Sequence, residues 1–161
     1  MRKSAKTTAA ETGKPSMAEV GTQLNEAQVT LSQRLYEATV EGHKRLAEVA
    51  NGFATARQEL DQETAKRAAE AATEYNKAAE QAGNKESAQQ ILAQAYQNYI
   101  KTLEGLNTES CRRLQDLHTQ HTAKWVEARE ASMKDARGHY VDHLKKVQQI
   151  WASLDVESLV A

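Results

Sequence analysis

The sequence is poor in residues that interrupt or cross-link a chain. Its 161 residues include one proline, one cysteine and one phenylalanine. Because proline breaks a helix interior, its scarcity leaves long stretches free to be helical. The lone Cys111 excludes an internal disulfide, so a reducing, cytoplasmic compartment is expected. No apolar run approaches the roughly 18 residues that a membrane span needs, and we expect no transmembrane segment.

What the sequence does have is the composition of long helices. Ala, Gln, Glu, Lys and Leu dominate the middle of the chain, and the mean hydropathy is −0.73. Most of these residues are strong helix formers, and runs of β-branched residues are missing. The composition therefore predicts an all-α fold. The first residues, MRKSAKTTAAETGKPS, lack the apolar centre of a secretory signal.

Charge is unevenly placed along the chain. The net charge is −1, but the first 16 residues carry a net charge of +3. A basic segment could contact nucleic acid or an anionic surface. Four basic residues are few, and the aromatic residues do not alternate with basic ones as they do in nucleic-acid binders. We therefore interpret residues 1–15 as a solvated, disordered leader and do not expect nucleic-acid binding.

The first helix has clear start and stop signals. Ser16 and Glu19 have the spacing of a capping box, in which each side chain bonds the other residue's backbone N–H. Gly83 suits the left-handed position that follows a helix. The sequence therefore predicts a helix over 17–82 and a turn over 83–86.

The second helix is expected to begin directly after this turn. Either Asn84 or Ser87 can cap it. We predict a helix over 87–152, so that residues 16–154 form a single hairpin domain. Residues 155–161 are then an apolar C-terminal tail, which either folds back on the first helix or frays.

Apolar residues recur every eleven residues, which is three helical turns at 3.67 residues per turn. Because this period is close to the natural 3.6, one face of a long helix stays apolar throughout. The second helix carries the groups Leu92/Tyr96/Tyr99, Leu103/Leu106/Ser110, Leu114/Leu117/His121, Trp125/Ala128/Ser132, Ala136/Tyr140/His143 and Val147/Trp151/Leu154. The first helix carries Val20/Leu24/Ala27, Leu31/Leu35/Ala38, Gly42/Leu46/Val49, Phe53/Arg57/Leu60, Thr64/Ala68/Ala71 and Tyr75/Ala79/Ala82.

The bulky members of these groups form the predicted interaction stripe. It comprises Leu24, Leu31, Leu35, Leu46, Phe53, Leu92, Leu103, Leu114, Trp125, Val147 and Trp151. The stripe is bulky far from the turn and small and Ala-rich near it. We expect the tightest packing and the oligomer contact at the end far from the turn.

Two helices of equal length on either side of a short turn favour an antiparallel hairpin. A turn centred near Asn84 predicts that Val20 faces Ile150 and that Phe53 faces Leu114 and Leu117. The alternative is a compact four-helix bundle, with breaks at 51–52 and 105–108. The eleven-residue period runs unbroken through both sites, which favours the hairpin.

A further hypothesis concerns Gly42, which this register places opposite Trp125. Glycine is a poor helix former, and room for the Trp125 ring would be a reason to keep it there.

The five histidines are candidate metal ligands. His118 and His121 share a helix face, as do His139 and His143. The sequence lacks the Glu-x-x-His and His-Glu-x-x-His patterns of metal-binding helices. We therefore predict no metal, no cofactor and no enzymatic activity. Cys111 lies beside two arginines but lacks the partners of a nucleophile.

One polar column accompanies the stripe of the second helix: Ser110, His121, Ser132 and His143. Buried polar residues can specify the register of an oligomer. The same column can equally be the solvent edge of the stripe, and both interpretations stay open.

A two-helix hairpin has a core only one residue deep, so a second hairpin would bury its apolar residues better. We predict a homo-oligomer, assembled as a four-helix bundle. The favoured function is that of a structural or scaffolding protein that self-associates and binds a partner through its stripe.

The Ala/Gln/Glu-rich stretch 65–94, the following Ala95-Tyr96-Gln97-Asn98-Tyr99-Ile100 and the Lys- and Thr-bearing leader resemble phasins. These are small helical proteins that coat bacterial polyhydroxyalkanoate granules. The resemblance covers about half of the chain and has no diagnostic motif. It implies binding to a granule or lipid surface, oligomerisation and a cytoplasmic bacterial setting, and it gives the alternative function.

Overall fold

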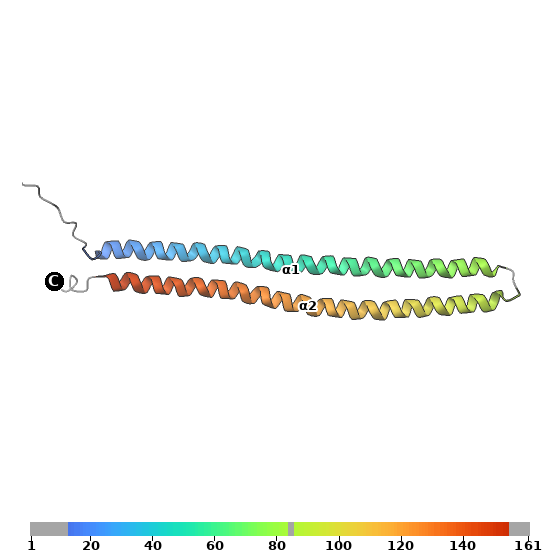
Figure 1. The fold of residues 1–161 in the computed structure, drawn as a ribbon. Helices are drawn as coiled ribbons and strands as arrows, with labels where there is room; N and C mark the ends of the chain where they lie inside the picture. The colour runs from blue at the N-terminus through green and yellow to red at the C-terminus, as the bar shows by residue number, and fades with distance from the viewer. Residues whose placement is uncertain (1–12, 84–85, 155–161) are drawn as a thin grey trace, which may run out of the picture. The chain divides into compact units, whose positions relative to one another are not determined.

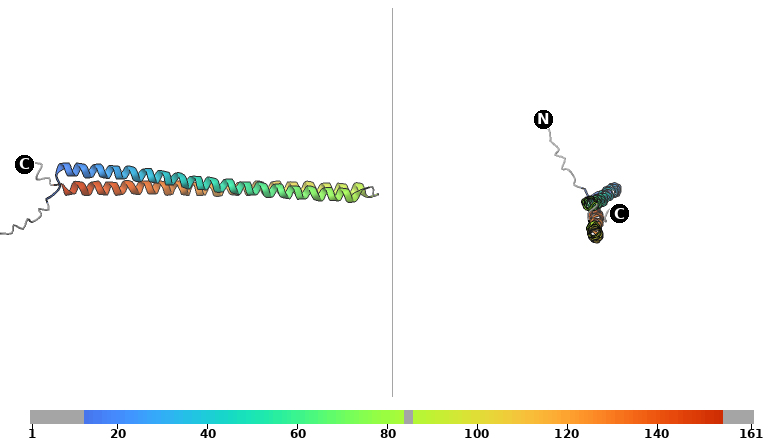
Figure 2. Two further views of the ribbon diagram at one scale, coloured as in Figure 1. Left: turned by 90° about the horizontal axis from the view of Figure 1, so that it is seen from above. Right: turned by 90° about the vertical axis from the view of Figure 1, so that its right-hand side faces the viewer.

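The computed structural model describes residues 13–83 and 86–154. Most of the expected leader, Asn84 and the tail 155–161 lie outside these ranges. The described chain forms two helices, α1 (Met17–Ala82) and α2 (Ala88–Ser153). They run antiparallel and pack as a hairpin (Figures 1 and 2), which confirms the all-α hairpin prediction. Both helices continue through 51–52 and 105–108, so the alternative with breaks at these sites is wrong.

The predicted capping box begins α1. The Ser16 backbone N–H donates to Oε2 of Glu19 over 2.7 Å, and the Glu19 backbone N–H donates to the Ser16 hydroxyl over 3.3 Å. The Val20 N–H donates to the Ser16 carbonyl over 2.9 Å, so Ser16 is the N-cap residue. Two N–H groups that the first helical turn leaves without helical partners are thereby satisfied.

Gly83 ends α1 as predicted. Its φ of 45° lies in the left-handed region, which costs a residue with a Cβ more than it costs glycine. After the turn, the Ile91 N–H donates to the Ser87 carbonyl over 3.1 Å. Ser87 is therefore the residue before α2, and the helix begins at Ala88, one residue later than expected.

The contacts divide the chain into two units. The terminal unit comprises Met1–Glu41 and Ala131–Ala161, of which 13–41 and 131–154 are described. The turn unit comprises Gly42–Glu130. In each unit, a segment of α1 lies beside a segment of α2 (Figure 1).

The terminal unit has a small apolar core. Val20, Ala27 and Ile150 are buried together, and Leu24 and Leu154 pack against them. The predicted proximity of Val20 and Ile150 is confirmed. This is the only cluster of buried residues that the described ranges contain, and it lies at the end of the hairpin that was expected to pack most tightly.

In the turn unit, aromatic contacts replace a large apolar core. The rings of Tyr75 and Tyr99 have centroids 5.7 Å apart. Phe53 packs against the rings of His118 and His121, with centroids 4.9 and 4.6 Å away. Burial in this unit falls on Leu60, Leu106 and small residues.

Phe53 lines a groove with the predicted Leu117 and also contacts two histidine rings of α2. Its ring partners lie one to seven residues further along α2 than the predicted Leu114 and Leu117. Every Cα–Cβ bond of a helix tilts toward the N-terminus of that helix. In an antiparallel pair the two tilts point in opposite directions along the common axis. A side chain of α1 therefore contacts a residue of α2 whose Cα lies about two positions further along α2 than the Cα at the same height.

Candidate interaction surface

The predicted stripe is mostly the surface that the two helices use against each other. We call this helix–helix surface the seam. Of the eleven predicted residues, Leu31 is buried and eight are half-buried: Leu24, Leu35, Leu46, Phe53, Leu92, Leu103, Leu114 and Val147. Most of the stripe is therefore partly covered within one chain.

The two tryptophans of the stripe are exceptions. Trp125 is 39% exposed and Trp151 is 49% exposed. Arg129 lies over the ring of Trp125, with Cζ 5.6 Å from its centroid. Gly42 is buried, but the exposure of Trp125 gives no support to the hypothesis that the glycine makes room for this ring.

One seam column of α2 differs from the prediction at three of its six positions. The predicted groups placed Tyr96, Tyr140 and Trp151 on the apolar face, and all three are exposed. The residue before each of them occupies the seam instead. The column with strict eleven-residue spacing is Ala95, Leu106, Leu117, Ala128, His139 and Ile150, and all six are buried or half-buried.

The signal for this column was present in the sequence. Strict spacing by eleven identifies it, but Ala and His look less like core residues than Tyr and Trp do. Seam burial in a hairpin is shallow, so small and amphipathic side chains such as Ala and His also fit there.

The polar column lies inside the seam. Ser110, His121, Ser132 and His143 are all half-buried. Nδ1 of His143 is buried without a hydrogen-bond partner among the described residues. A buried polar atom without a partner lowers stability. His143 therefore weakens the seam of α2 at its own position.

The histidine pairs take different positions. His118 and His121 pack their rings against Phe53, whereas His139 and His143 line a groove with Asp142 and Arg34. Among the residues that the structure describes, no group of three or more His, Cys, Asp or Glu side chains is arranged to hold a metal ion. Cys111 is exposed.

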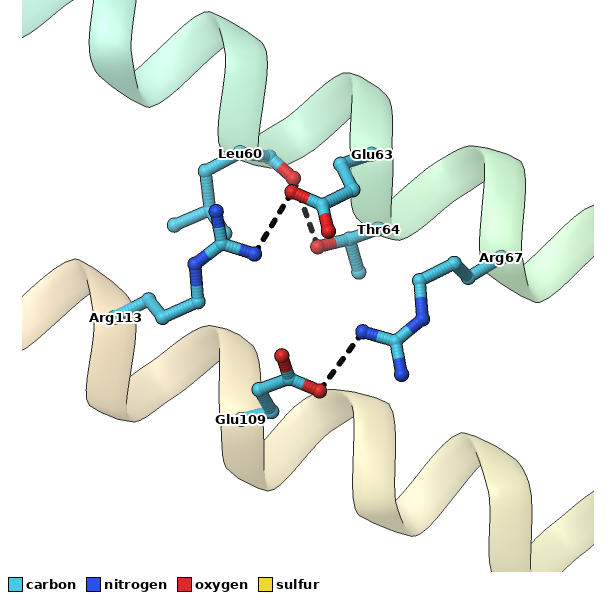
Figure 3. A network of polar contacts seen from close by, with 6 residues as sticks. All are labelled: Leu60, Glu63, Thr64, Arg67, Glu109 and Arg113. Carbon is cyan, nitrogen blue, oxygen red and sulfur yellow. Dashed lines mark hydrogen bonds and ion pairs between the residues drawn. The ribbon is translucent and has the colours of Figure 1, made fainter.

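Two ion pairs connect the helices in the turn unit (Figure 3). Arg67 Nη1 lies 2.8 Å from Oε2 of Glu109, and Arg113 Nη1 lies 2.8 Å from Oε2 of Glu63. The hydrogen bond from Arg67, followed by its positive charge, holds the pKa of Glu109 below its usual value. Nearby, the Thr64 hydroxyl donates to the Leu60 carbonyl over 2.8 Å, which keeps this polar group satisfied beside the seam.

Large apolar side chains remain exposed outside the seam. They are Met17, Val29, Tyr36, Tyr96, Trp125, Val126, Met133, Tyr140, Val141, Leu144 and Trp151. Tyr36 is 72% exposed and Leu144 is 65% exposed. Isolated exposed apolar residues are normal, but contiguous apolar surface marks interaction sites. The side chains of this set are therefore the candidates for contact with a partner.

Neither described helix contains a stretch apolar enough to cross a membrane. Comparisons with protein-family models, with curated proteins and with solved structures find no match to this chain. The arrangement of the chain's own residues is therefore the basis for a functional proposal.

Proposed function

We propose that this chain is a non-enzymatic structural protein that self-associates and offers its helices as a scaffold for a partner. The observation that carries this proposal is the set of exposed apolar side chains outside the seam. Two tryptophans, three tyrosines and several aliphatic residues belong to it. Exposing so much apolar area in water costs about 25 cal/mol per Å², which is recovered when another surface covers it.

The shallow core supports the same proposal. Only eight apolar residues are buried among those described, and three of them are alanines. A hairpin of this kind gains little from its own seam. Association with a second helical surface adds a second seam to each helix, as in four-helix bundles.

The direct test of self-association is molar mass. Size-exclusion chromatography with light scattering at micromolar concentration should give a multiple of the 17.9 kDa chain mass. The fraction of the larger species should rise with concentration. A mass of one chain at every concentration would contradict the proposed self-association.

A second candidate is a phasin-like coat on a polyhydroxyalkanoate granule or a lipid surface. It is favoured by the exposed tryptophans and tyrosines, because such amphipathic rings settle at boundaries between water and apolar material. Co-sedimentation with polyhydroxyalkanoate particles and with lipid vesicles separates the candidates. A coat protein binds the particles through these residues, whereas a scaffold stays in the supernatant at its oligomer mass.

A further inference from the structure

In the terminal unit, one side of α1 carries no charge. The charged residues between positions 17 and 41 are Glu19, Glu26, Arg34, Glu37 and Glu41. With eleven residues in three turns, each residue advances by roughly 98° around the helix. All five then fall on one side of α1. The opposite side carries Met17, Gly21, Asn25, Val29, Ser32 and Tyr36.

The α2 segment of this unit has a matching side. Between positions 131 and 153, the same rotation places Met133, Tyr140, Leu144, Gln148 and Trp151 together, and all five are exposed. Arg137 is the one charged residue among them. Among the remaining charged residues of the segment, Asp135, Asp142 and Lys146 lie on the far side of the seam, and Lys134 and Lys145 lie on the back of α2, opposite the seam.

These two sides form one face of the unit. Both helices are right-handed and they run antiparallel. On each helix, the residues reached by turning about 90° from the seam, in the sense in which the chain winds as it advances, therefore lie on the same side of the hairpin. The grooves of the unit lie on the other side. One is lined by Glu19, Gln23 and Lys146, and the other by Arg34 and Asp142. We call the face with Tyr36 and Leu144 the outer face.

We propose that a second copy of this chain covers the outer face, related by a two-fold axis parallel to the helices. In this arrangement, α1 of each copy lies against α2 of the other. The inference rests on the proposed self-association and adds its surface and its geometry. A face that is almost free of charge does not repel its own copy, as a face with charge of one sign would.

The relative heights of the side chains support this orientation. The cluster of Val20, Leu24, Ile150 and Leu154 fixes which residues of α1 and α2 are level. A rotation about an axis parallel to the helices leaves these heights unchanged. If a residue of α2 is level with a residue of α1 in one copy, the same α2 residue of the second copy is therefore also level with that α1 residue.

Three level pairs on the outer face are complementary. Asn25 meets Gln148 of the second copy, and their amides can exchange hydrogen bonds. Tyr36 meets Arg137 of the second copy, which gives the one charged residue of the face an aromatic partner. A third pair brings the Trp151 ring to Gly21, whose missing side chain leaves room for it.

Antiparallel copies lack this matching. An axis perpendicular to the helices would place α1 on α1 and α2 on α2, so that Tyr36 and Arg137 lie on different helix pairs. The tyrosine would then lose the arginine as a partner. The parallel axis is therefore the orientation that the side chains favour.

The size of the outer face suits a dimer. Each segment has about 24 residues, or roughly 36 Å at 1.5 Å per residue, and each helix is about 10 Å wide. Two helices side by side offer about 700 Å² per copy, or about 1,400 Å² in total. Specific interfaces bury about 1,200–2,000 Å². An apolar granule could not satisfy Asn25, Ser32 and Gln148, whereas a second helical surface can.

The first test places a charge on the outer face. Leu144→Glu should weaken association about tenfold or more, since a desolvated carboxylate without a partner is costly. Gln149→Glu adds the same charge on the other side and should leave the dissociation constant unchanged. Sedimentation equilibrium measures both. If the wild type associates and Leu144→Glu does so equally well, the proposed face is wrong while self-association stands. If the wild type is monomeric, the proposed self-association itself is wrong.

The second test does not depend on weakening the dimer. In a Cys111→Ser background, Asn25→Cys and Gln148→Cys proteins are unfolded, refolded as a mixture and treated with a short bis-maleimide. The mixed cross-link should dominate over either like-with-like product. Gln23→Cys with Gln149→Cys is the matched control and should give little product. Dominant like-with-like products, or equal cross-linking of the control pair, would overturn the proposed orientation.

Discussion

Nη1 of Arg67 on α1 lies 2.8 Å from Oε2 of Glu109 on α2, and the neighbouring pair reverses the signs. There, Glu63 on α1 receives Arg113 from α2, also at 2.8 Å. Each helix thus presents one acid and one base to the other, as Figure 3 shows. A slide of one helix along the other would break both pairs, so they contribute to the register of the turn unit.

Reversing one charge of such a pair should weaken the hairpin, and reversing both should restore it. Glu63→Arg places two cations together and should lower the free energy of unfolding by less than about 1 kcal/mol, since partly exposed pairs contribute little. Adding Arg113→Glu should recover most of the loss. Urea unfolding followed by circular dichroism gives the coupling from the double-mutant cycle. Additive effects of the two reversals would contradict a direct interaction.

The same region should respond to acid. The pKa of Glu109 is held low in the folded chain, mainly by the Arg67 hydrogen bond. The unfolded chain therefore binds a proton at higher pH, and the stabilisation is fully present only above the ordinary glutamate pKa of about 4.3. It is lost as the pH falls through the lower, folded value.

Melting temperatures measured from about pH 7 down to about pH 3 should therefore decline less steeply for Glu109→Gln than for the wild type below the ordinary glutamate pKa. Salt should reduce the difference, because the side chains are partly exposed. Identical pH profiles for the two proteins would show that the Arg67 contact does not hold in solution.

Seam and outer-face leucines should differ sharply on truncation. Leu60 is 4% exposed, and Leu60→Ala removes buried methyl groups, which costs about 2–5 kcal/mol in protein cores. We expect the lower end of this range, because the seam is shallow and can collapse. Leu144→Ala, at a residue 65% exposed, should change the stability of the single hairpin little. Chemical unfolding, at a protein concentration too low for association, measures the free energy of unfolding of both variants. An equal decrease for the two variants would contradict the assignment of Leu60 to the seam.

The helix pattern was largely readable from the sequence. Capping at Ser16 and Glu19, the left-handed Gly83 and the eleven-residue period all act locally, within a turn or two of helix. The eleven-residue period also predicts the seam of α1 correctly. Every residue of the predicted α1 groups except Arg57 is buried or half-buried.

Other features depend on how the two helices meet and could not be predicted from one helix alone. The ring contacts of Phe53 with His118 and His121 require the opposite tilt of side chains on antiparallel helices, which a count from the turn leaves out. The exposure of Tyr140 and the partial burial of its neighbour His139 have the same origin. Packing space decides such positions, and it depends on the partner helix.

Glycine substitutions should have opposite effects at helical and turn positions. A Cβ added at Gly52 meets nothing within 4 Å, so Gly52→Ala should stabilise α1 by about 1 kcal/mol through helix propensity. Gly83→Ala should destabilise the hairpin by about 1 kcal/mol, because its φ of 45° strains an L-residue. Thermal unfolding by circular dichroism measures both. Stabilisation by Gly83→Ala would contradict the left-handed cap.

Concentration-dependent burial of Trp151 tests the central claim most directly. In a Trp125→Phe variant, Trp151 is the sole tryptophan, 49% exposed in the single hairpin. If a second copy covers the outer face, Trp151 emission should shift to shorter wavelength and acrylamide quenching should fall as protein concentration rises. Both changes should follow the association curve from sedimentation. Red-shifted, readily quenched emission at every concentration, including those at which the protein is associated, would contradict this interface.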